Sequence, residues 1–97
     1  MKRDDYVFSI GFDGSTAIVD KRSRSRHKGK NAQQLADDGQ FKAAYRMTVF
    51  DHDVKAADDV LAAFNAVSPV KYAQSSDLAK VFGVQPPSDG ITSSRAV

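Results

Sequence analysis

Residues 6–19 read YVFSIGFDGSTAIV and carry a strong signal for a β-hairpin. Side chains alternate up to residue 12 with a period of two, which is typical of a strand. The residues that share one face of this strand are all large and apolar: Tyr6, Phe8, Ile10 and Phe12. Asp13-Gly14 follows and favours a tight turn, because glycine accepts the positive φ that such turns require. Residues 16–19 then predict the second strand.

Two registers remain open for this hairpin. A two-residue turn places Ala17 opposite Ile10. Val19 then lies opposite Phe8, and the hairpin has one apolar face. A three-residue loop would instead place Ile18 opposite Ile10, and such a one-residue slip changes which side of the second strand is buried. We favour the two-residue turn.

Residues 31–50 predict two helices. Asn31 and Gln34 have the spacing of a capping box, so a short helix begins there and ends at Gly39. The second helix covers about residues 40–50 and has apolar side chains on two faces. A helix of this kind is expected near the centre of the core.

Two further helices are expected before residue 84. Asp53 has the position of an N-cap for a third helix, whose apolar residues recur at helical spacing and which ends before Pro69. A fourth, short helix covers about residues 76–82 and ends at Gly83. Residues 85–97, QPPSDGITSSRAV, have the composition of a disordered and flexible C-terminal tail.

Strands followed by helices predict an α+β fold. We expect residues 1–84 to form one domain, in which an N-terminal β-hairpin (6–20) packs on a small bundle of three to four helices (31–83), with residues 21–30 between them. The chain has 97 residues, of which 41% are hydrophobic and 27% charged, as in ordinary soluble proteins. Cysteine is absent, and no apolar run is long enough to span a bilayer. These features favour a cytoplasmic protein with no role in a membrane.

Residues 20–30, DKRSRSRHKGK, are the most unusual part of the sequence. Their six cations are Lys21, Arg22, Arg24, Arg26, Lys28 and Lys30. Outside them, eight basic residues stand against 12 acidic ones, a net charge of −4. The positive charge of the chain is therefore concentrated in one segment, and local charge density governs contact with a polyanion.

The cations of this segment would form a regular row if the second strand continues through it. Alternation would then place four cations on one face: Arg22, Arg24, Arg26 and Lys28. Their spacing of about 6.6 Å suits the backbone of DNA or RNA or another anionic surface. Lys21, His27 and Lys30 complete the predicted contact residues. The alternative is a flexible loop whose charges keep the protein soluble or pair with the acidic helical body. The Arg-Ser-Arg-Ser-Arg stretch also invites phosphorylation of Ser23 or Ser25.

The sequence favours a small, non-enzymatic regulatory or accessory protein that contacts nucleic acid or another polyanion through residues 21–30. No catalytic motif is present, and we expect no cofactor or metal; the acidic cluster at Asp51-His52-Asp53 is better explained by helix capping. The alternative is a protein–protein interaction module without a nucleic-acid role. It would be a homodimer joined through hairpin edges, with Val7 and Ile18 supplying apolar contacts.

Two short stretches resemble known motifs. Residues 35–46, LADDGQFKAAYR, resemble the helix–turn–helix junction of a tetratricopeptide repeat, but no second copy follows 34 residues later. Residues 75–84, SSDLAKVFGV, resemble the first helix and turn of a DNA-binding helix-turn-helix, and residues 91–97 look like a truncated recognition helix. Each resemblance implies a helical pair, and the first covers about a dozen residues.

Overall fold

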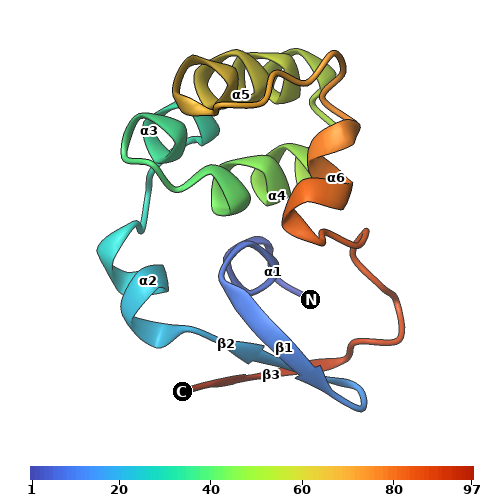
Figure 1. The fold of residues 1–97 in the computed structure, drawn as a ribbon. Helices are drawn as coiled ribbons and strands as arrows, with labels where there is room; N and C mark the ends of the chain where they lie inside the picture. Colours follow the sequence, from blue (N-terminus) through green and yellow to red (C-terminus); the bar gives the residue numbers. More distant parts are fainter.

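The computed structural model describes all 97 residues and is an α+β fold of six helices and one three-stranded sheet. The elements follow one another as α1 (Arg3–Val7), β1 (Ser9–Asp13), β2 (Thr16–Val19), α2 (Lys21–Arg26), α3 (Ala32–Asp37), α4 (Phe41–Asp51), α5 (Val54–Val67), α6 (Asp77–Phe82) and β3 (Ser93–Ala96). The sheet lies at one end of the molecule and helices α3 to α6 lie at the other (Figure 1). None of the helices combines the length and apolar character that crossing a bilayer requires.

Strand β2 is the centre of the sheet, antiparallel to β1 and parallel to β3. Strand β3 lies within the segment expected to be a disordered tail, and within residues 91–97, which were compared above to a recognition helix; both expectations are wrong there. All four of its residues are exposed, so the sequence carries no apolar signal for a strand. Backbone pairing defines it instead, including the bond from the Val97 N–H to the Val19 carbonyl at 3.0 Å.

The hairpin adopts neither expected register. Its two-residue loop is Gly14-Ser15, so Asp13 pairs with Thr16, and a bulge follows between Ser9 and Gly11. Gly14 has a φ of 60°. A glycine in the left-handed region at the first position of a two-residue loop is typical of a type II′ turn.

The first strand begins later than the alternation predicts. Residues 3–7 form helix α1, and Tyr6, Val7 and Phe8 are all buried. Three consecutive buried side chains do not fit a strand with one buried face, whereas a short helix and the turn after it can direct all three inward. The prediction that Ile10 and Phe12 belong to a buried apolar face is therefore wrong, because their side chains are 63% and 51% exposed.

The predicted helix ends are confirmed in α3, α5 and α6. Asn31 and Gln34 form the reciprocal capping box of α3. The Asp53 side chain accepts a hydrogen bond from the Ala56 N–H at the start of α5. Gly39 and Gly83 follow α3 and α6 with positive φ, as C-terminal caps commonly do.

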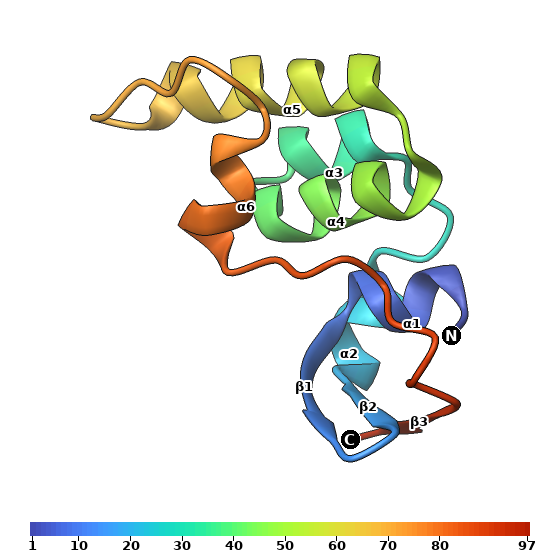
Figure 2. The same cartoon turned by 90° about the vertical axis from the view of Figure 1, so that its right-hand side faces the viewer.

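Helix α1 separates the sheet from the helical part of the molecule. It packs against α4 on one side and β2 on the other, while α4 also contacts α3 and α5 (Figure 2). The sequence predicts that the hairpin lies across the helices, but most of the packing between the two parts passes through α1, and Arg46 of α4 adds a direct hydrogen bond to the Ser9 carbonyl of β1. One continuous core nevertheless joins both ends, because Phe8 and Val19 belong to the same buried cluster as Leu35 and Val60.

Candidate polyanion-binding surface

The basic segment is a helix and not an extension of the second strand. The Asp20 side chain caps α2 by accepting hydrogen bonds from the N–H groups of Arg22 and Ser23, at 3.1 and 3.2 Å. Arginine and lysine are good helix formers, so the chain turns into a helix once the cap is made. The Ser23 hydroxyl also donates to Asp20. The hydrogen bonds from the Ser23 N–H and hydroxyl are the largest causes that lower the pKa of Asp20 below its ordinary value.

The helical rotation redistributes the cations. At about 100° per residue, alternate residues no longer share a face, so the predicted row of four cations does not exist. Arg22 and Arg26, four residues apart, lie on one side of α2, and Arg24 points to another. Four of the six cations are exposed and form no ion pair within the chain: Lys21, Arg22, Arg26 and Lys28.

Arg24 is occupied inside the protein. Its Nη1 donates to Asp5 Oδ1 at 2.7 Å, and Ser94 Oγ donates to the other oxygen of the same carboxylate at 2.8 Å. Burial alone would raise the pKa of Asp5, but the hydrogen bonds from Ser94 and Arg24 outweigh it and lower that pKa. This contact joins α1, α2 and β3, so Arg24 braces the fold.

His27 and Lys30 also have internal partners. His27 is buried and stacks on Phe8, with ring centroids 6.2 Å apart. The Lys30 ammonium lies 3.2 Å from His27 Nδ1 and donates to Asp38. That hydrogen bond is the largest cause of the lowered pKa of Asp38. Neither residue belongs to the exposed cationic surface, although both were predicted to be part of it.

A polar hollow of about 620 Å³ lies between the start of α1 and the last turn of α2. No hydrophobic residue lines it; its residues are Lys2, Arg3, Asp4, Asp5, Arg24, Ser25 and Lys28. Lys2 is exposed and extends the cationic surface beyond α2. Lys2 was not among the residues predicted from the sequence, because only the folded chain brings the N-terminal residues beside residues 24–28.

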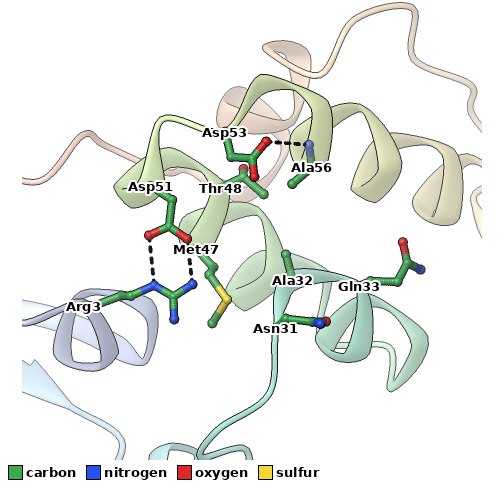
Figure 3. Close-up of a pocket in the computed structure, with 9 residues that line it drawn as sticks. All are labelled: Arg3, Asn31, Ala32, Gln33, Met47, Thr48, Asp51, Asp53 and Ala56. Atoms are coloured by element: carbon green, nitrogen blue, oxygen red, sulfur yellow. Dashed lines mark hydrogen bonds and ion pairs between the residues drawn. The ribbon is translucent and has the colours of Figure 1, made fainter.

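A second hollow, of about 250 Å³, lies where the first turns of α3 and α5 approach α1 (Figure 3). Arg3 spans its edge and donates to both carboxylate oxygens of Asp51, at 2.9 and 2.6 Å. The first turn of α3 is capped by Asn31, and that of α5 by Asp53. Asp51 and Asp53 of the acidic cluster therefore have structural roles. The remaining polar side chains of this hollow bond to residues outside it: Asn31 to Gln34, Gln33 to Asp37 and Thr48 to Tyr45.

Comparison with known proteins identifies no matching family model, no similar curated protein and no similar solved structure.

Proposed function

We propose that the protein binds the phosphate backbone of nucleic acid through the exposed side of α2. One observation carries the proposal: Lys21, Arg22, Arg26 and Lys28 have no ionic partner within the chain, although acidic residues outnumber basic ones elsewhere. Lys21, Arg22 and Arg26 lie on α2 within an arc of about 140° at 100° per residue, and Lys28 lies two residues past the end of the helix. We name this set the α2 cationic surface.

The chemistry of the α2 cationic surface favours backbone contact over base reading. Each lysine or arginine that neutralises a phosphate releases a condensed counterion and so adds a salt-dependent increment of affinity. No aromatic residue lies among residues 20–30, so the surface offers no ring on which a base could stack. Duplex DNA, with regularly spaced phosphates, is therefore the preferred probe.

The proposed role is that of a non-enzymatic accessory protein in the cytoplasm. Both histidines have a structural place in the fold, since His27 stacks on Phe8 and His52 is the C-cap of α4. The absence of cysteine is consistent with a reducing compartment.

Duplex binding is tested by fluorescence anisotropy over a range of salt concentrations. If all four residues contact phosphates, log K should fall with log salt with a slope of about −3.6. The double variant Lys21→Gln/Lys28→Gln should bind more weakly, with a slope of about −1.8. The matched control, Lys55→Gln/Lys80→Gln, removes the same charge from α5 and α6 and should bind like the wild type.

Two outcomes would contradict the proposal. One is no binding by the wild type at low salt. The other is an equal loss of affinity in the control, because the effect would then follow net charge and not the α2 cationic surface. Circular dichroism of each variant separates either outcome from loss of the fold.

A second candidate function is self-association through β1, which has no strand partner on its outer side. The apolar residues available for this contact differ from those predicted from the sequence. Val7 is buried, whereas Ile10 and Phe12 are exposed on β1 itself. Phe12 also lines an apolar hollow of about 310 Å³ with Met1, Pro86 and Ile91. Light scattering tests this candidate: a dimer that persists on dilution supports edge pairing, and a monomer excludes it.

A further inference from the structure

The two serines of the basic segment differ in their surroundings. Ser23 Oγ donates to Asp20 Oδ2 at 3.0 Å, and its side chain is half-buried. Ser25 is exposed and its hydroxyl makes no hydrogen bond within the chain. Only Ser25 thus has a hydroxyl free to react.

The charges around Ser25 are suited to a phosphate group. On a helix, the neighbours of a residue are those three and four positions away, about 5–6 Å between Cβ atoms. For Ser25 these are Lys21 and Arg22, while Lys28 lies just past the end of α2 and lines the same hollow as Ser25. Ser25 also lines the polar hollow between α1 and α2, whose other six residues are four cations and two carboxylates: Lys2, Arg3, Arg24, Lys28, Asp4 and Asp5. A phosphate there has room and two ammonium groups without an ionic partner in the chain, those of Lys2 and Lys28.

Phosphate on Ser23 would have the opposite effect. It would stand beside the Asp20 carboxylate, where like charges repel, and it would remove the hydroxyl that now bonds to Asp20. The flanking sequence also favours Ser25 over Ser23 as the phosphorylated residue. A cation, Arg22, lies three residues before Ser25, whereas a carboxylate, Asp20, lies three residues before Ser23.

We propose that Ser25, and not Ser23, is a phosphorylation site for a protein kinase that selects arginine before the serine, and that its phosphate occupies the hollow between α1 and α2. Ser25 is exposed on α2, so its hydroxyl is accessible to a kinase. Modification then weakens binding by the α2 cationic surface; this second statement rests on the proposed function.

The reaction requires a kinase and ATP as co-reactants. The Ser25 hydroxyl oxygen forms a bond to the γ-phosphorus of ATP, and the bond from that phosphorus to the oxygen bridging to the β-phosphate breaks. ADP leaves, and the hydroxyl proton passes to the catalytic carboxylate of the kinase. The product carries about −1.5 to −2 charges at neutral pH, which offsets about half of the four exposed cations.

The full chain is treated with ATP and an arginine-directed protein kinase, and the modified residue is located by mass spectrometry. We expect one phosphoryl group on Ser25, retained in Ser23→Ala and lost in Ser25→Ala. Absence of incorporation, or incorporation at Ser23 to an equal extent, would overturn the proposed site. This readout does not depend on nucleic-acid binding.

Binding of the modified protein to duplex DNA tests the second statement. We expect about a tenfold loss of affinity at moderate salt, because about two of four counterion-releasing contacts are cancelled. Kinase-treated Ser25→Ala should bind like the untreated protein. Equal binding of modified and unmodified wild type would overturn the regulatory effect. If the unmodified protein does not bind DNA, the proposed function fails while the site at Ser25 stands on its own evidence.

Discussion

Asp5 is the residue that holds together three segments far apart in the sequence. Its buried carboxylate accepts hydrogen bonds from Arg24 of α2 and Ser94 of β3. A buried charge is tolerated when it is paired and hydrogen-bonded, and both oxygens of Asp5 have such partners. Arg24 depends on the same contact, because its side chain is largely covered.

This contact predicts how stability changes with pH. The pKa of Asp5 is lower in the folded chain than its ordinary value of 3.8, so its contribution is fully present above that value and is lost as the pH falls through the folded pKa. Asp5→Asn cannot titrate and leaves Arg24 without its ionic partner. We therefore expect the variant to be less stable than the wild type at pH 7, with a gap that narrows below pH 3.8.

Urea unfolding of both proteins at neutral and acidic pH measures this gap. Asp4→Asn is the matched control, because Asp4 lies beside Asp5 in α1 and accepts no side-chain hydrogen bond. An Asp5→Asn deficit of the same size at both pH values would show that the lost stability does not come from the ionised carboxylate.

Strand β3 is the part of the sheet that was not predicted from the sequence. It completes the second edge of β2 and places Ser94 against Asp5. Removing residues 91–97 should lower the free energy of unfolding by about 2 kcal/mol or more, since a hydrogen bond to a charged group alone contributes about 1.5–3 kcal/mol. Thermal or urea unfolding of the shortened chain measures the loss.

The control for this truncation is Ser94→Ala in the full chain. It removes only the bond to Asp5 and should cost less than the deletion, because the backbone pairing with β2 remains. A shortened chain as stable as the wild type would mean that residues 91–97 behave as the flexible tail that their composition suggests.

Elements were predictable to the extent that local interactions define them. The caps Asn31 and Asp53 act within three residues of their own position, so α3 and α5 could be located from the sequence. Asp20 acts in the same local way at the start of α2. Its signal was present but was outweighed by the alternation of Arg and Ser, which suggested a strand.

At the scale of the whole molecule, the basic segment divides into a structural and an exposed half. Arg24, His27 and Lys30 point toward α1, Phe8 and α3, while the α2 cationic surface faces solvent. The fold also brings Lys2 beside this surface and places Ser25 in the hollow between them. The cations that follow one another along residues 21–30 therefore point in different directions in the folded chain.

The sequence by itself determined the α+β class, the ends of the helices after residue 30 and the concentration of positive charge in residues 21–30. These features depend on composition and on contacts between near neighbours. Tertiary structure alone decided that Arg24 pairs with Asp5 and that β3 joins the sheet. Those contacts link residues 19 or more positions apart, and the partners are short polar segments whose periodicity carries no record of which side will be buried.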